Sequence, residues 1–108
     1  MSLEELVEER SKICELFSHP LRNLVMLLII AKGEITWTEL LKTLRKRFGD
    51  VNPNTLSFHL GKLTEAELLE KIEIGGQPRY KIISDKLPEV ELLIGKKTIT
   101  VAKKEFSE

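Results

Sequence analysis

The chain has 108 residues, of which 31% are charged and 42% hydrophobic, so one soluble, folded domain with a single core is expected. Its 17 basic residues balance its 17 acidic residues, which argues against binding to nucleic acid through bulk positive charge. A single cysteine excludes a cysteine-cluster metal site, and the longest apolar run, residues 24–31, is too short for a membrane span of about 20 residues.

The first predicted element is an amphipathic helix over residues 2–17, where apolar side chains recur near helical spacing. Five acids against two basic residues give residues 1–19 a net charge of −3. Such a helix either covers its own core or packs against a partner chain, and the sequence leaves both interpretations open. Cys14 on its apolar stripe is interpreted as a small buried hydrophobe, with an inter-chain disulfide as the alternative if two such helices meet.

A second helix is predicted from Pro20, a residue suited to a first helical turn, until Gly33 ends it. This helix is apolar on nearly every side. That pattern predicts a position at the centre of the domain or at a surface shared with a partner.

A short strand at residues 34–35 precedes a third helix, which Thr36 caps and in which Glu39 completes a capping box. Its apolar face follows helical spacing up to Phe48. The basic side chains within residues 42–47 fall elsewhere on the cylinder, open to water or to phosphate groups. A solvated face and a phosphate-binding face are both compatible with this charge run.

A fourth helix begins with Asn52 as its cap and Pro53 in its first position. Its inner face consists of leucines at positions 56, 60 and 63. The outward face consists of Asn54, Phe58, Gly61 and Lys62, flanked by Ser57 and His59. Solubility alone does not call for such a combination, so this face is the first candidate for a binding surface.

A β-hairpin follows, with strands predicted at residues 69–74 and 79–83 around a turn at residues 75–78. Alternation places Tyr80 and Ile82 inward and Arg79 and Lys81 outward on the second strand. In the tail, a short helix starts near Ser84 and is broken at position 95. The β-branched, alternating residues 97–102 favour a strand, with a helix through to residue 106 as the alternative.

The order helix, helix, short strand, helix, helix, hairpin resembles that of the ArsR-like winged-helix transcription regulators of bacteria and archaea. The likeness covers residues 18–83. It rests on Ser-His-Pro-Leu-Arg at residues 18–22, on the Ser-x-His-Leu-x-x-Leu run at residues 57–63, and on Arg79-Tyr80 in the returning strand. The metal sensors of that family carry paired cysteines in the region of residues 38–44, and none is present here, so metal sensing is discarded. Glu67 stands where family members commonly have glycine.

The resemblance implies an α+β, mostly helical fold: a winged helix-turn-helix with an added N-terminal helix and a short C-terminal extension. We expect residues 1–108 to form a single winged-helix DNA-binding domain. Its parts are an N-terminal dimerisation helix at residues 1–18, a winged-helix core at 19–83 and a C-terminal extension at 84–108.

In this family's fold the fourth helix, residues 52–66, is the recognition helix and would enter the major groove, with the wing at residues 74–80 on the backbone or minor groove. Asn54 suits adenine, Lys62 suits guanine or phosphate, and Phe58 suits a thymine methyl group unless it packs under the first helix or the wing. The predicted DNA-binding residues are Asn54, Thr55, Ser57, Phe58, His59, Lys62, Gln77, Arg79, Lys81, Lys42 and Lys46. A lone histidine such as His59 is more often a packed, hydrogen-bonded residue than a sensor.

The predicted function is therefore a sequence-specific regulator of transcription that binds double-stranded DNA as a homodimer. The predicted dimer interface consists of Leu3, Leu6, Val7, Cys14 and Phe17. No catalytic pattern, metal site, cofactor, membrane contact or small-molecule effector is predicted. Without a secretory leader the protein is expected in the cytoplasm, at the nucleoid. The many charges with few Asn and Gln are typical of a thermophile. The alternative is a winged-helix protein-interaction module without DNA affinity, which the zero net charge and acidic first helix favour.

Overall fold

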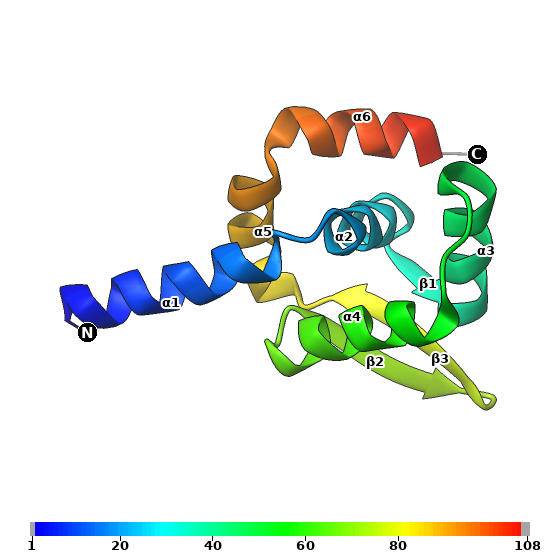
Figure 1. The fold of residues 1–108 in the computed structure, drawn as a ribbon, viewed down its shortest axis with the longest axis horizontal. Helices are drawn as coiled ribbons and strands as arrows, with labels where there is room; N and C mark the ends of the chain where they lie inside the picture. The colour runs from blue at the N-terminus through cyan, green and yellow to red at the C-terminus, as the bar shows by residue number, and fades with distance from the viewer. Residues whose placement is uncertain (1, 107–108) are drawn as a thin grey trace.

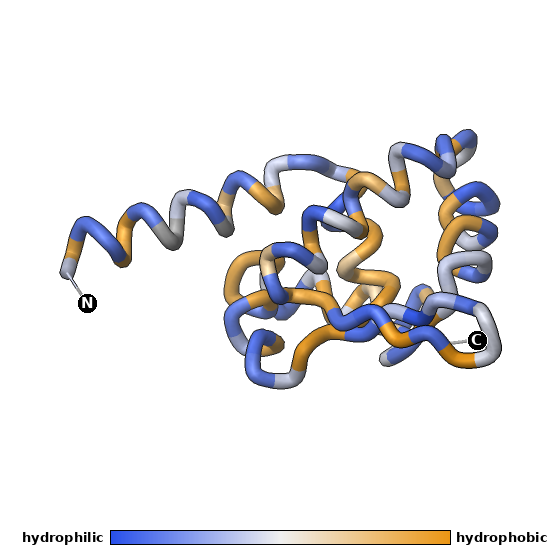
Figure 2. The backbone as a smooth tube through the Cα atoms, turned by 90° about the horizontal axis from the view of Figure 1, so that it is seen from below, coloured by the Kyte–Doolittle hydropathy of each residue, from blue (hydrophilic) through white to orange (hydrophobic). Residues whose placement is uncertain are grey.

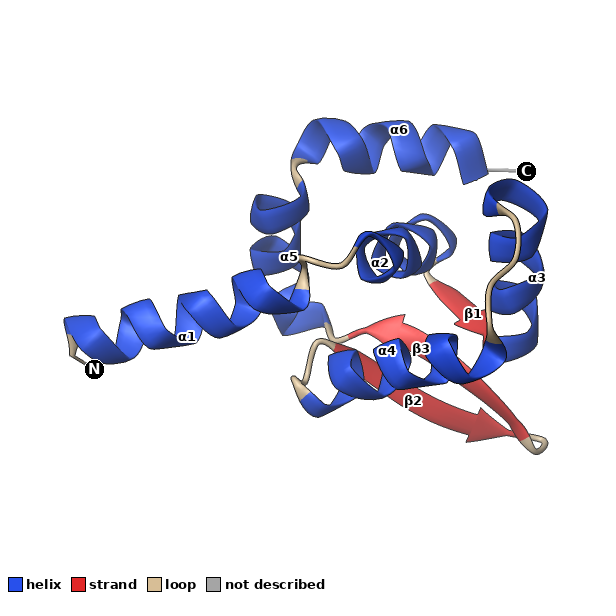
Figure 3. Ribbon diagram, in the orientation of Figure 1, coloured by secondary structure: helices blue, strands red, loops and turns tan. Residues whose placement is uncertain are grey.

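A computed structural model describes residues 2–106, except the side chains of residues 9, 10 and 13. Helices surround a central helix, and a small sheet lies along one edge (Figures 1 and 3). The elements are α1 (Leu3–Leu16), α2 (Pro20–Lys32), β1 (Glu34–Thr36), α3 (Trp37–Phe48), α4 (Pro53–Glu65), β2 (Leu69–Ile74), β3 (Gln77–Ile82), a 3-10 turn (Ser84–Lys86), α5 (Leu87–Ile94) and α6 (Lys96–Phe106). The predicted α+β, mostly helical winged helix-turn-helix fold is confirmed.

Helix α2 is the centre of the domain, as its all-round apolar surface predicts (Figure 1). Its Val25, Met26, Leu28 and Ile29 have no exposed surface. Helices α3, α4 and α6 and strand β3 all contact it. The helix ends at Gly33, whose N–H donates to the carbonyl oxygen of Ile29 at 2.7 Å.

Local capping fixes the two helices of the helix-turn-helix, α3 and α4. The Thr36 hydroxyl accepts from the Glu39 N–H at 3.1 Å, and the Asn52 carboxamide oxygen accepts from the Asn54 N–H at 2.8 Å. These side chains satisfy backbone donors that a helix start otherwise leaves without partners. Both predicted caps are confirmed, and the buried leucines of α3 and α4 join the core around α2.

The wing is an antiparallel hairpin, and β1 pairs with β3 on its other edge, which gives the strand order β1-β3-β2. The buried Tyr80 faces the core and Arg79 lies on the opposite face of the sheet, as predicted. The turn is shorter than expected: Gly75 and Gly76 alone form it, with φ of 62° and 80°. Gln77 and Pro78, expected in the turn, already belong to β3.

Helix α1 extends away from the rest of the molecule (Figures 1 and 2). Its apolar Leu3, Leu6 and Val7 are 72%, 50% and 58% exposed. Among the residues whose side chains the structure describes, only Leu16 and Phe17, at the end of this segment, pack partly against the core. The interpretation that α1 covers its own core is therefore wrong for the single chain, and so is the expectation of a buried Cys14, which is exposed.

The strand expected at residues 97–102 is wrong, because these residues lie in helix α6. In a helix, Ile99, Ala102 and Phe106 share one face, and all three are buried, where α6 contacts α2. Burial of this face outweighs the preference of β-branched residues for strands. The short helix broken at Gly95 is confirmed as α5.

Candidate nucleic-acid interface

The outer face of α4 brings five of the predicted DNA-binding residues to one surface. Those residues, Asn54, Thr55, Ser57, Phe58 and Lys62, are all exposed. They face outward because the leucines on the other side of α4 are buried in the core, which fixes the rotation of the helix about its axis. The result is an outer face with amide, hydroxyl, aromatic and ammonium groups on a rigid support.

Phe58 is 55% exposed and lies among cations. The Lys62 Nζ is 5.4 Å from the centre of its ring, and the Arg22 Cζ is 6.0 Å away. The alternative in which Phe58 packs under α1 or the wing is therefore not what the structure shows. Cations beside the face of an aromatic ring stabilise its position, so Phe58 forms a positioned apolar surface on α4.

His59 lies on the inner side of α4 and is only 8% exposed. Its Nδ1 accepts a hydrogen bond of 2.8 Å from the Nε of Arg22, which is itself 6% exposed. Burial, followed by the charge of Arg22 and then by His19, lowers the pKa of His59 below 6.5. His59 is therefore a neutral, packed residue that ties α4 to α2, in keeping with the interpretation favoured from the sequence.

Arg22 is the residue that sequence reasoning missed at this site. It also donates from Nη1 to the carbonyl oxygen of Leu16 at 3.3 Å, so one guanidinium joins α1, α2 and α4. The only signal in the sequence was its place in the Ser-His-Pro-Leu-Arg run. Pattern alone could not connect it to His59, because 37 residues separate them.

On the wing, Gln77 is exposed, while Arg79 and Lys81 are half-buried. The Nε of Arg79 is buried and, among the described residues, has no hydrogen-bond partner. Lys81 pairs with Glu70 across the hairpin at 3.7 Å. The register places Gln77, Arg79 and Lys81 on one face of the sheet. Ile74 at the tip lies on the same face, is 59% exposed and was not among the predicted DNA-binding residues.

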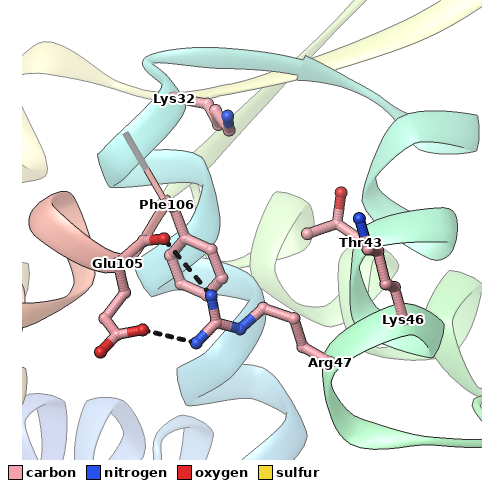
Figure 4. A pocket seen from close by; sticks show the side chains of 6 residues that line it. All are labelled: Lys32, Thr43, Lys46, Arg47, Glu105 and Phe106. Atoms are coloured by element: carbon pink, nitrogen blue, oxygen red, sulfur yellow. Dashed lines mark hydrogen bonds and ion pairs between the residues drawn. The ribbon is translucent and has the colours of Figure 1, made fainter. Parts of the chain in front are cut away.

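The basic residues of α3 separate into two groups. Lys42 and Lys46 are exposed, as a phosphate-binding face requires. Arg45 instead donates to the Val51 carbonyl oxygen at 3.2 Å, in the turn before α4. Arg47 pairs with Glu105 at 2.7 Å and lies 4.8 Å from the ring centre of Phe106. Figure 4 shows how this arginine connects α3 to the end of α6, beside Lys46 and Lys32 in a pocket of about 220 Å³.

The predicted dimer-interface residues lie in two places. Leu3, Leu6, Val7 and Cys14 are exposed on the projecting helix. Phe17 is half-buried against the core of its own chain.

Within residues 2–106, no helix has the length and apolar character needed to cross a membrane. The same residues contain no group of three or more metal-ligating side chains.

A helix-turn-helix on a buried helical core, with a hairpin beside its second helix, defines a winged helix-turn-helix protein. Residues 17–72 match the family described as "Helix-turn-helix domain", and the chain belongs to that family. Membership supports a DNA-binding transcription regulator rather than an enzyme, because this motif places its second helix in the major groove.

Solved structures are similar to the chain in fold. HlyU from Vibrio cholerae N16961 is 20% identical, with a TM-score of 0.67 over 84% of this chain and 94% of that chain. Rv0081 of M. tuberculosis is 18% identical, with a TM-score of 0.68 over 95% and 97%. NolR from Sinorhizobium fredii is 22% identical, with a TM-score of 0.64 over 83% and 86%. At these identities the likeness shows the fold alone. No curated protein matches the chain.

Proposed function

We propose that this protein is a homodimeric, sequence-specific regulator of transcription that binds double-stranded DNA at the nucleoid in the cytoplasm. The recognition helix, residues 52–66, lies in the major groove, and the wing, residues 74–80, lies on the backbone or minor groove. Residues 1–18 form the dimerisation helix of a single DNA-binding domain. The observation that carries the proposal is the polar outer face of α4, held outward by buried leucines on its other side.

Each side chain of this face has a role in reading or holding DNA. Asn54, in the first turn of α4, pairs with adenine, because residues near the start of a recognition helix reach the base edges. Lys62 contacts guanine or a phosphate, and Thr55 and Ser57 donate to phosphates. Phe58 contacts a thymine methyl group, since its ring is exposed and supported by neighbouring cations. His59 is buried and acts by positioning α4 rather than by touching DNA.

The wing and α3 supply backbone contacts on either side of the recognition helix. Gln77, Arg79 and Lys81 share the outer face of the hairpin, and Lys42 and Lys46 are exposed on α3. Such contacts set the register of a protein on the duplex without reading its sequence.

Two copies associate through α1. Its exposed apolar residues Leu3, Leu6 and Val7 lie on the arm that projects beyond the core. A two-fold dimer presents two recognition helices, which read half-sites about 34–36 Å apart, one turn of the duplex. Cys14 is exposed on the same arm, so two copies that meet there can bring their thiols together.

The first experiment is selection of bound duplexes from a random pool by the purified protein at about 0.1 M salt, where specific and non-specific binding separate. Enrichment of a palindromic motif supports a dimeric, sequence-reading regulator. Binding without any enrichment contradicts sequence specificity and indicates an architectural protein.

With the selected duplex, Lys62→Ala and Arg79→Ala are each expected to weaken binding and to lower the slope of log affinity against log salt by about one. The measurement is fluorescence anisotropy over a salt series. Lys97→Ala, which removes an exposed lysine from α6, is the matched control and should leave the slope unchanged. Unchanged slopes for both interface variants would contradict this docking.

The second candidate function is a protein-interaction module without DNA affinity of its own. The specific observation in its favour is the exposed apolar surface of α1 on a chain with zero net charge. Absence of any duplex binding at moderate salt, together with a partner that requires α1, would replace the first proposal with this one.

A further inference from the structure

A groove of about 380 Å³ lies where the base of α1, the start of α2 and the end of α4 meet. Its basic lining residues are Lys12, Arg22 and Lys62, and His19 adds an imidazole. Two acids, Glu15 and Glu65, also line it, and both are exposed. Three cations from three different helices therefore line the groove, of which Lys12 pairs with Glu8 at 3.6 Å.

Arg22 distinguishes this groove from an ordinary solvated surface. Its exposed fraction is only 6%. Even so, none of the ion pairs among the described residues includes it. Buried charges in proteins are normally paired, because removing them from water is costly. The partners of Arg22 are a neutral imidazole and a backbone carbonyl, so its positive charge is not neutralised.

The two hydrogen bonds of Arg22 do not use all the N–H donors of its guanidinium group. Of its five N–H groups, the two hydrogen bonds of the structure use one on Nε and one on Nη1. The remaining donors belong to a group that lines the groove. A planar guanidinium fork is the side chain best suited to two oxygens of one phosphate, and partial burial strengthens the attraction.

We propose that this groove is a binding site for an oxyanion of the phosphate type, held by Arg22 with help from Lys12, His19 and Lys62. The acids at the rim oppose the anion, so the binding is weak, with half-saturation at about 1–10 mM. The anion neutralises the charge of Arg22 and joins α1 to α4. Because Arg22 also holds His59, occupancy of the groove changes how firmly the recognition helix is held.

The phosphate can come from two sources, a soluble small molecule or the backbone of DNA. Lys62 lines the groove and also lies beside Phe58 on the outer face of α4. A backbone phosphate of DNA bound to that face could therefore reach the groove. The binding chemistry is the same in both cases. Binding of a soluble oxyanion does not depend on the proposed function.

The primary test is an NMR titration of the full chain with inorganic phosphate near neutral pH, with sodium chloride at equal ionic strength as the control series. The expected result is saturable shifts of the Arg22 Nε–H and of the backbone amides of His19 and Lys62. Shifts that do not saturate, or that match those in the chloride series, would overturn the proposal.

Two variants test the assignment of the ligands. Lys12→Gln should raise the half-saturating phosphate concentration several-fold, because Lys12 is exposed and its loss leaves the core intact. Lys97→Gln on α6 is the matched control and should behave as the wild type. Arg22→Lys keeps a charge but removes the fork, so saturation should disappear, provided that thermal unfolding shows a folded protein. If Arg22→Lys does not fold, the test of the ligands is Lys12→Gln. A half-saturating phosphate concentration for Lys12→Gln equal to that of the wild type would contradict the assignment.

Phosphate titrations in the presence of the selected duplex, at constant ionic strength, distinguish the two sources of the phosphate group. If the groove holds a DNA phosphate, Lys12→Gln lowers DNA affinity and the salt slope, and inorganic phosphate competes with the duplex. If the ligand is a soluble oxyanion, phosphate changes the DNA affinity of the wild type, the same change in Lys12→Gln needs a several-fold higher phosphate concentration, and the salt slope is unaltered. Both results support the site. A protein that binds phosphate saturably but no DNA would contradict the proposed function and leave this inference standing.

Discussion

Helices α1 and α2 follow one another in the chain and differ completely in what covers them. The 13 residues of α2 are apolar on nearly every side and form the centre of the domain. The 14 residues of α1 carry a narrower apolar stripe, and Leu3, Leu6 and Val7 on it are at least half exposed on a helix that extends away from the domain (Figure 2). Periodicity predicts a helix in both cases, but only the width of the apolar surface distinguishes a core helix from one that a partner must cover.

Hydrogen bonds hold the junction between α1 and α2, although the apolar residues at the start of α1 are exposed. The Asn23 side chain donates to the Phe17 carbonyl oxygen at 2.7 Å, and Arg22 donates to that of Leu16 at 3.3 Å. These bonds fix the direction in which α1 leaves the core. Isolated helices of about 12–15 residues are marginal in water, so the proposed association of two copies would also stabilise the 14 residues of α1.

The largest effect is expected in the core helix. Leu28 has no exposed surface, so Leu28→Ala should lower the free energy of unfolding by about 2–5 kcal/mol, through lost burial and a cavity. Urea denaturation at one fixed protein concentration measures it. Leu92→Ala is the matched control on a leucine that is 77% exposed, and should change little. Equal losses for the two leucines would contradict the central position of α2.

On the arm, the combined change Leu6→Ala and Val7→Ala should leave the fold intact but weaken the dimer. Loss of these contacts is expected to raise the dissociation constant about 10–100-fold, corresponding to about 1.4–2.8 kcal/mol. Sedimentation equilibrium measures the constant, and circular dichroism checks the fold. Val101→Ala, on an exposed valine of α6, is the control. A dissociation constant that does not move would show that the apolar stripe of α1 is not the interface.

The buried Arg22–His59 contact makes the stability of the core sensitive to pH. The neutral imidazole accepts from Arg22, and protonation removes that acceptor and places a second cation beside the guanidinium. Because the pKa of His59 is lowered on folding, the unfolded chain binds the proton more readily. The contribution is fully present above pH 6.5, the unfolded value, and is lost as the pH falls through the folded value.

Lowering the pH from about 7.5 to about 5.5 should therefore reduce the free energy of unfolding by about 1 kcal/mol, the worth of one buried hydrogen bond. Denaturation at a series of pH values provides the measurement. His59→Asn keeps an acceptor near the Nδ1 position but does not titrate, so its profile should be flatter. His19 is present in both proteins, and the difference between them isolates His59. Identical profiles would mean that the contact is not linked to protonation.

Sequence reasoning predicted the core fold well because local signals and tertiary contacts agree there. The caps at Thr36 and Asn52, the stop at Gly33 and the hairpin at Gly75 are short-range features, visible in a few neighbouring residues. The prediction for residues 97–102 was wrong for the opposite reason. These residues favour a strand by local preference, and the surface of α2 that turns them into α6 is distant in sequence.

The residues of the candidate site fall into the same two groups, those that local pattern predicts and those that depend on contacts between distant segments. Helical geometry identified Asn54, Phe58 and Lys62 on the outer face of α4, because a residue's angle around the helix follows from its number. It wrongly placed His59 beside that face, since His59 is buried. Ile74 was correctly assigned to the strand, but its exposure at the wing tip depends on which face of the sheet the core covers. The contact of Arg22 with His59 joins two helices, and the spacing of residues on either one carries no record of it.

The smallest effect concerns Glu67, the one non-glycine residue with positive φ, 60°, among residues 2–106. It ends α4 in a closing turn, in which the Leu68 N–H donates to the Leu63 carbonyl oxygen at 3.1 Å. Glycine adopts this conformation without the strain that a Cβ introduces, so Glu67→Gly should raise the free energy of unfolding by about 0.5–1 kcal/mol. Glu65→Gly, two residues earlier and at the last position of α4, should lower it, because glycine weakens a helix. Urea denaturation compares the two, and the dissociation constant of the dimer should be the same for both, since neither residue lies on the arm. A loss of stability in Glu67→Gly would contradict strain at that position.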